Sequence, residues 1–263
     1  MISRSVVDSV RRGGLVPLLL CLPAATHAAH TGTEPGFTIA PYGWLAGIDG
    51  TVGAPGADLD DGSGSAPTRV DVSLDPDYEL KGFMFYGEWR GERWMAFVDS
   101  VWANIKQGAT LRLAGIGQGI DTDAEVDGNV FTAALGYRVH ETENSAFVVY
   151  GGARYYDLEV KLSADASLLP VSARSTSNDT WTDGIIGAKW NYRIADKWQS
   201  VVEGNYGYGE SDSSWQITAT LGYSFSWGRL VGGWRHLDID HSTKTYRLDA
   251  SMTGPLVGAV FDF

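Results

Sequence analysis

The sequence has little cysteine, no long apolar run beyond its first thirty residues and no excess of basic side chains. Its one cysteine, Cys21, lies in a stretch that we expect to be removed, so the mature chain needs no disulfide. An α-helical membrane protein is excluded, because a spanning helix needs about 18 consecutive apolar residues. The formal net charge of -12 argues against a nucleic-acid partner.

The first 28 residues predict a secretory signal peptide. Arg11 and Arg12 precede an apolar core at residues 15–22, and small residues follow up to an expected cleavage site near Ala28. A leucine stands before Cys21, where a lipoprotein signal needs a small residue, so lipidation is rejected. Ordinary secretion is favoured over the twin-arginine route. The strand pattern described below is that of a membrane barrel, and such a protein must be exported in the unfolded state.

The chain is rich in glycine and aromatic residues, with 33 Gly, 10 Trp and 12 Tyr, and this composition points to many strands. The last strand has an apolar row at every second position: Val257, Ala259, Phe261 and Phe263. In a water-soluble protein such a terminal edge would promote aggregation, so something must cover it. We expect lipid to cover it, as in a transmembrane barrel strand.

Segments of alternating polarity recur about ten times between turn signals, an even number as in bacterial single-chain barrels. The predicted strands are residues 37–48, 82–90, 93–105, 123–139, 146–162, 180–193, 198–209, 214–225, 230–240 and 246–263. Short connections alternate with long polar ones, such as residues 107–123 and 164–178. The short turns should be periplasmic and the long loops extracellular.

The fragment at residues 70–74 also alternates, but counting it would make the number of strands odd. We therefore place it in an extracellular hairpin or folded over the mouth, and leave open whether residues 49–80 plug the barrel. Several strands exceed the roughly 9 to 11 residues that span a bilayer, so their outer halves should project from the membrane. Eight or twelve strands are the alternatives to ten.

One face of the strands is apolar, with aromatic residues at its ends and small aliphatic residues between them. Trp94 and Trp102 stand eight positions apart, about 20 Å along the membrane normal, which matches the band between two aromatic girdles. A soluble β-sandwich or lipocalin-like barrel, the alternative, would turn this face inward. The sequence thus predicts an all-β fold, a transmembrane antiparallel up-and-down β-barrel over residues 29–263.

The opposite face carries charged side chains that should point into the lumen: Asp99, Arg154, Asp183, Lys189, Glu203 and Arg235. Buried charges are tolerable only when they are paired, and three acids with three bases can neutralise one another. Two interpretations stay open, a charged constriction of a pore and a structural salt-bridge network in a narrow lumen. Bulky inward side chains favour the closed network: Tyr86, Tyr150, Tyr156 and Trp181.

Signatures of an enzyme are few. Four residues near one extracellular loop could form a catalytic cluster: His236, Asp240, His241 and Ser242. Outer-membrane hydrolases use such residues at the barrel rim, but a strand end followed by a polar turn explains the same residues and is favoured. Acidic residues at the extracellular strand ends lack the spacing of a calcium loop. We therefore predict no catalytic residue, no metal site and no cofactor.

With these residues in place, the chain resembles a family of bacterial outer-membrane β-barrel proteins of uncharacterised function. The matching stretches are PYGWLAGIDGTVG, ERWMAFVDSVWANI, LGYRV, GARYYDLEV, DGIIGAKWNYRIADKW and GPLVGAVFDF. Their order and spacing cover most of the mature chain. The resemblance implies a barrel fold and membrane placement, without an activity or a ligand. Family members tend to have tyrosine in place of His236, which argues against catalysis by that residue.

From the sequence we expect an integral protein of the bacterial outer membrane with a narrow, charge-lined lumen. The predicted roles are envelope structure, surface binding or passage of small solutes, and the alternative is a rim-located hydrolase acting on lipid or peptide. The expected partners are outer-membrane lipids, lipopolysaccharide and the barrel-assembly machinery. Phe261 and Phe263 would form the C-terminal assembly signal.

Overall fold

The computed structural model describes residues 34–53, 69–74, 79–111, 120–165, 172–242 and 247–263. The predicted signal peptide lies outside these residues. All regular secondary structure in the described ranges is β, and no helix within them is long and apolar enough to cross a membrane.

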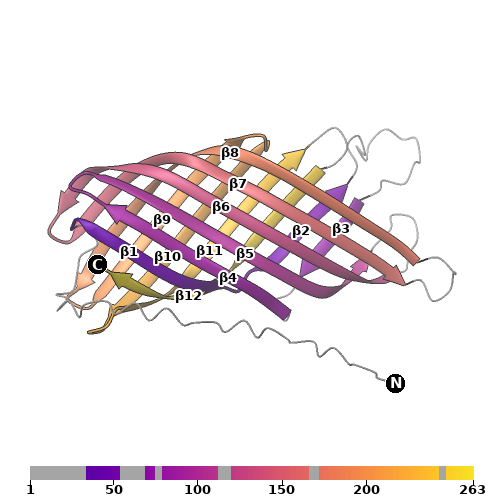
Figure 1. The fold of residues 1–263 in the computed structure, drawn as a ribbon, viewed down its shortest axis with the longest axis horizontal. Helices are drawn as coiled ribbons and strands as arrows, with labels where there is room; N and C mark the ends of the chain where they lie inside the picture. Colours follow the sequence, from indigo (N-terminus) through magenta and orange to yellow (C-terminus); the bar gives the residue numbers. More distant parts are fainter. Residues whose placement is uncertain (1–33, 54–68, 75–78, 112–119, 166–171, 243–246) are drawn as a thin grey trace, which may run out of the picture.

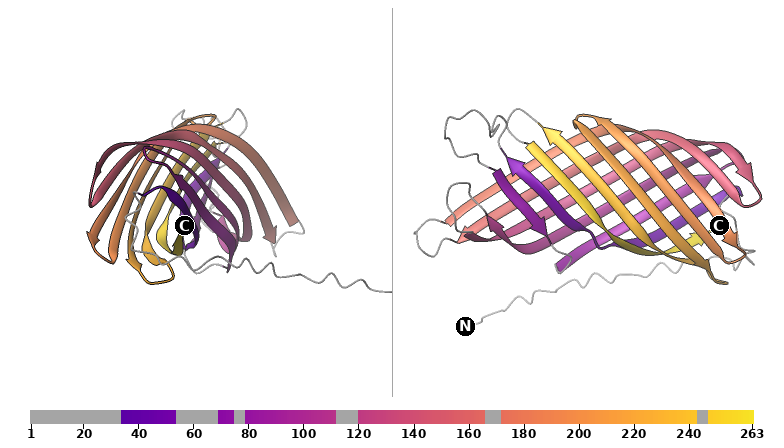
Figure 2. Two further views of the ribbon diagram at one scale, coloured as in Figure 1. Left: turned by 60° about the vertical axis from the view of Figure 1, so that its left-hand side comes forward. Right: turned by 180° about the vertical axis from the view of Figure 1, so that it is seen from behind.

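Ten strands close into an antiparallel barrel, which confirms the predicted fold (Figures 1 and 2). The ring runs in order from β1 through β4 to β12, and β1 pairs with β12 to close it. The strand bounds are β1 Gly36–Trp44, β2 Gly47–Gly53, β3 Arg69–Leu74, β4 Glu79–Arg90, β5 Trp94–Leu111, β6 Ile120–Thr142, β7 Ser145–Asp165, β8 Ser172–Ala195, β9 Trp198–Gly209, β10 Ser213–Ser224, β11 Arg229–Ser242 and β12 Arg247–Asp262. The start of β1, the C terminus and the short turns share one end of the barrel, which we call the periplasmic end (Figure 1).

The first membrane strand is interrupted where it passes β12. β1 and β2 both pair with β12, and Leu45 lies between them and donates its N–H to the carbonyl oxygen of Pro255 at 2.9 Å. Proline has no N–H to give in return, so the ladder cannot run on regularly. A Cβ at Gly254 would lie 1.9 Å from the oxygen of Leu45, so only glycine admits this close backbone approach. The strand predicted at residues 37–48 is therefore two elements.

β3 contains the fragment that the sequence places in a hairpin or over the mouth. It pairs with β2 from Ile48↔Leu74 to Gly53↔Arg69 and so forms an antiparallel hairpin. This hairpin stands at the end of the barrel opposite the C terminus (Figure 2). The strand count of the ring therefore stays even, with β3 as an addition to the wall.

The strands from β5 to β8 are longer than predicted. The predicted loops at residues 107–123 and 164–178 are wrong in their extent, because β5 and β6 pair as far as Leu111↔Ile120 and β7 and β8 as far as Asp165↔Ser172. A ladder outside the bilayer needs only its backbone hydrogen bonds. Polar sequence without an apolar face can therefore continue the strands.

The exterior of the barrel is apolar, with aromatic residues near both ends. At the periplasmic end, the rings of Trp94 and Tyr137 meet edge to face at 5.1 Å, and those of Trp198 and Tyr223 at 5.0 Å. Toward the other end, exposed aromatic side chains include Phe83, Trp102, Tyr155, Tyr208, Trp215 and Trp234. An exposed apolar surface of this extent, bounded by two aromatic belts, suits contact with lipid.

Candidate functional site

An apolar plug fills the lumen on the side away from the short turns. Its members are Trp44, Ala46, Met84, Val101, Val130, Tyr156, Trp181, Leu237, Ile239, Leu248 and Leu256. Ala46 lies between β1 and β2, and the others come from every strand of the ring except β9 and β10. Tyr156 and Ile239 are 0% exposed and Trp181 is 2% exposed, so water does not reach this level of the lumen at these side chains.

The six predicted lumen charges all lie on the inner face, at or below the plug: Asp99, Arg154, Asp183, Lys189, Glu203 and Arg235. The strand register places three of them in one cross-strand row, because Lys189 is the partner of Glu203 on β9, and the row continues through β10 to Arg235 on β11. Only Asp99 and Arg235 form an ion pair with each other, at 3.0 Å. The other four charges bind side chains outside this set of six.

Arg235 is held at mid-lumen by partners from several strands. Its Nη1 donates to the hydroxyl of Tyr42 at 2.8 Å, and Tyr42 in turn donates to Asp99 at 2.6 Å. The side-chain oxygen of Gln216 accepts from Nε and Nη2 of the guanidinium, and the Trp44 ring lies 4.8 Å from its carbon. This cluster joins the charged level to the lower surface of the plug.

A chain of alternating charges crosses the lumen toward the periplasmic end. Lys189 pairs with Glu88 at 2.5 Å, Glu88 with Arg90 at 2.9 Å, Arg90 with Asp262 at 3.2 Å and Arg229 with Asp262 at 3.3 Å. The sequence reasoning missed these partners of Lys189. The alternation of side chains along the strand could have identified them, since Glu88 and Arg90 follow Tyr86, a predicted inward residue, at every second position.

Glu203 and Arg154 are joined through neutral side chains. Tyr150 donates its hydroxyl to Glu203 at 2.8 Å and accepts from Asn205 at 3.0 Å. Arg154 donates to the Asn205 side-chain oxygen at 2.7 Å and to Thr132 at 3.1 Å. Room for the Tyr150 ring comes from a glycine on β8, where an added Cβ would lie 2.5 Å from a ring carbon. These contacts hold both charges in fixed positions.

Asp183 is satisfied by hydroxyl and amide donors. Ser211 gives it a backbone N–H at 3.0 Å and a hydroxyl at 2.6 Å, and Ser214 gives a hydroxyl at 3.1 Å. Arg154 is its register partner on β7, yet the two form no salt bridge. Both side chains are 0% exposed, so they are part of the buried interior.

The residues of the hydrolase alternative are not brought together. His236 faces outward and its ring lies 4.5 Å from that of Trp215. His241 faces the lumen, where its ring stacks on Trp181 at 4.2 Å. Ser242 is exposed on the face of β11 opposite His241. The hydrolase alternative is thus unsupported, and the described residues contain no group of three or more histidine, cysteine or acidic side chains that could hold a metal ion.

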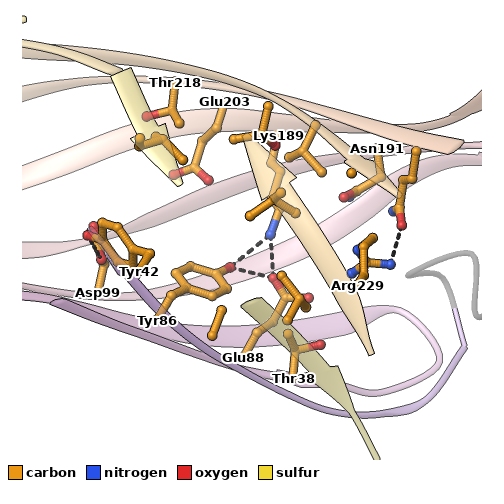
Figure 3. A pocket seen from close by; sticks show the side chains of 18 of the residues that line it. Thr38, Tyr42, Tyr86, Glu88, Asp99, Lys189, Asn191, Glu203, Thr218 and Arg229 are labelled. Carbon is orange, nitrogen blue, oxygen red and sulfur yellow. Dashed lines mark hydrogen bonds and ion pairs between the residues drawn. The ribbon is translucent and has the colours of Figure 1, made fainter. Parts of the chain in front are cut away.

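Below the plug, the lumen contains a partly open cavity of about 160 Å³ (Figure 3). Its walls run from Tyr42 and Leu256 at the plug to Arg90 and Arg229 beside the short turns. Figure 3 shows Lys189 reaching from β8 toward the Tyr86 hydroxyl and the Glu88 carboxylate of β4. The cavity is large enough to hold a small molecule.

No protein-family model matches the chain, and no curated protein is significantly similar to it in sequence. Solved structures with a similar course of the chain include the translocator domain of the autotransporter NalP from Neisseria meningitidis, at 15% identity over 88% of this chain and 91% of that one, with a TM-score of 0.42. The outer membrane protein OprG from Pseudomonas aeruginosa is 10% identical over 88% and 98% of the two chains, with a TM-score of 0.39. The attachment invasion locus protein Ail of Yersinia pestis is 12% identical over 87% and 100%, with a TM-score of 0.35. The closed ring, the apolar exterior and the two aromatic belts are those of a transmembrane β-barrel of the type found in bacterial outer membranes.

Proposed function

We propose that the protein is a closed, non-conducting barrel that serves the structure of the outer membrane. The observation that carries this proposal is the apolar plug, whose central side chains are sealed from water inside the lumen. Ions need a hydrated path or a row of coordinating groups, and a packed apolar level offers neither. Lipid and lipopolysaccharide are the partners that the exterior fits.

The charges below the plug support the same role. The bases Arg90, Lys189, Arg229 and Arg235 are matched in number by the acids Glu88, Asp99, Glu203 and Asp262. A selective pore presents a ring of one sign to the permeating ion. A balanced network instead crosslinks β4, β8, β11 and β12 through the lumen, which stiffens the barrel wall.

We expect the refolded full chain to show no steady conductance in a planar lipid bilayer. A variant that empties the plug, with Trp181, Leu237 and Ile239 all changed to serine, should show discrete openings, because polar side chains of small volume admit water to that level. The measurement is single-channel current at fixed voltage. Steady conductance by the unmodified protein would overturn the closed-barrel proposal.

The matched control changes three outward residues of comparable size to serine: Trp190, Ile217 and Leu221. These side chains face lipid, so their loss leaves the plug intact and the bilayer current should stay at baseline. Openings of equal size in the control would mean that loss of wall stability, rather than removal of the plug, produces the current.

We also propose that Phe261 and Phe263 act as the signal read by the barrel-assembly machinery. Support comes from their place at the closing seam, where Phe263 and Phe37 exchange two backbone hydrogen bonds of 2.8 and 2.9 Å. Phe263 is 47% exposed beside this seam, which leaves its ring available to a partner before closure. The last residue therefore combines a recognisable side chain with the strand edge that must be joined.

Changing Phe263 to alanine should slow barrel formation several-fold in vesicles that contain the assembly machinery, and should leave unassisted folding in detergent almost unchanged. The measurement is the appearance over time of the heat-modifiable folded band on a gel. Trp227→Ala, a loss of another exposed periplasmic aromatic side chain, is the control. Equal slowing with and without the machinery would assign Phe263 to folding alone.

A further inference from the structure

The cavity below the plug has one apolar wall and one charged wall. The apolar wall comes from β9, β11, β12 and β1, with Val201, Val231, Val260, Leu256 and Ala40 turned toward the cavity. Thr218 and Thr220 of β10 extend this wall. A surface of this kind binds the hydrocarbon part of a ligand, since covering it removes apolar area from water.

The charged wall presents one unused donor and one unused acceptor. An ammonium group has three N–H donors, and Lys189 uses two of them, on the Tyr86 hydroxyl at 2.8 Å and on Glu88 at 2.5 Å. Glu203 accepts the Tyr150 hydroxyl at one oxygen, and its second oxygen has no hydrogen-bond partner in the described part of the chain. Lys189 is 6% exposed and lines the cavity, so its third N–H can bind only a group within the cavity.

The two unused groups stand side by side. Lys189 and Glu203 are direct register partners on β8 and β9, and paired residues of neighbouring strands hold their Cβ atoms about 5 Å apart. Figure 3 shows both side chains descending into the same space. A ligand head that accepts one hydrogen bond and donates another fits this pair.

The charge balance selects a neutral ligand. The cavity and its mouth already contain equal numbers of acidic and basic groups, and every base among them contacts a carboxylate. An added ion would leave one uncompensated charge in the lumen, which is costly in a medium of low polarity. A neutral head that both donates and accepts satisfies Lys189 and Glu203 without this cost.

We propose that this cavity binds a small neutral amphipathic molecule that enters from the periplasmic end. Its head is a primary amide or a hydroxyl between Lys189 and Glu203, and its body is a short aliphatic chain against Val201, Val231 and Val260. A cavity of roughly 150 Å³ holds one benzene molecule, so the ligand has about six to eight non-hydrogen atoms. This binding role goes beyond the closed-barrel function, and ligand binding is measured separately from conductance.

The test uses the refolded full chain in lipid nanodiscs with isotope-labelled valine methyl groups, titrated with hexanamide. Saturable chemical-shift changes are expected at the inward Val201, Val231 and Val260. The outward valines at positions 149, 202 and 257 report partition of the probe into lipid, so their shifts should stay small or rise without saturation. Saturation at the outward valines alone, or at none, would overturn the proposal.

Two charged probes of equal length, hexylammonium and hexanoate, test the predicted neutrality. Each should bind at least tenfold more weakly than hexanamide at the inward valines. If either ion bound more tightly than hexanamide, the proposal would be overturned, because the cavity would then carry a net charge that attracts that ion.

Two variants test the two halves of the site. Val231→Phe places a larger side chain in the cavity and should weaken hexanamide binding at least tenfold. Val257→Phe, on the lipid side, should leave the affinity for hexanamide within twofold of the unmodified protein. If the first variant fails to fold, Glu203→Gln provides the second measurement. Loss of the charged acceptor there should weaken binding about fivefold, since hydrogen bonds to ionised groups are about twice as strong as neutral ones. Unchanged affinity for hexanamide in the variants that fold would contradict the proposed site.

Discussion

Replacement of Trp181 by alanine is expected to lower the free energy of unfolding by about 3–5 kcal/mol, the range for loss of a large aromatic side chain from a packed core. Trp181 is 2% exposed at the centre of the plug. Its ring is stacked between those of Tyr156 at 4.7 Å and His241 at 4.2 Å, so both neighbours lose a contact surface. The cavity left behind has rigid strand walls around it and cannot collapse fully.

The measurement is equilibrium unfolding in urea with the barrel in lipid vesicles, followed by circular dichroism. Trp190→Ala, on the same strand but 44% exposed to the outside, is the matched control. Lipid chains replace the contacts of Trp190, so its loss should cost clearly less. If the two variants are destabilised equally, the plug contributes no more to stability than the lipid-facing surface does.

Changing Arg235 to methionine should also lower the free energy of unfolding by about 3–5 kcal/mol, because it leaves the largely buried carboxylate of Asp99 without its cation. Arg235 is 3% exposed and lies 3.0 Å from Asp99. Tyr42 would remain as the donor to Asp99, while the oxygen of Gln216 would lose both of its hydrogen-bond donors. Methionine keeps much of the side-chain length, so the loss of stability reports the removal of the charge more than a change in volume.

A double-mutant cycle separates the ion pair from its surroundings. Asp99→Leu alone leaves the opposite charge buried, whereas the double variant with Arg235→Met removes both charges and should recover most of the lost stability. The same unfolding measurement gives the coupling free energy between the two positions. Strictly additive losses would show that the pair at 3.0 Å contributes nothing as a pair.

The inner and outer faces of the strands could be predicted because a strand alternates its side chains with a period of two. Lipid on one side and a narrow lumen on the other make that period visible in the sequence. Trp94 and Trp102 face outward, and Lys189 and Arg235 face inward, for this reason. The even number of strands follows because the start of β1 and the end of β12 meet at the periplasmic end.

Partners across the lumen could not be predicted in the same way. Lys189 pairs with Glu88, which belongs to a strand four places away around the ring, and the period of a strand says nothing about what stands opposite. The lengths of β6 and β8 were underestimated for a related reason. Outside the lipid, backbone pairing continues without an apolar face, so the amphipathic signal ends before the strand does.

The seam between the first and last strands has a consequence for folding kinetics. Thr38 and Asp262, which are hydrogen-bonded there, are 224 positions apart in the sequence. Contacts of such high sequence separation cost the most chain entropy to form and slow the folding reaction. Every intermediate that lacks the seam exposes two unpaired strand edges, so the lifetime of the open sheet sets the interval during which the chain is vulnerable to aggregation and proteolysis.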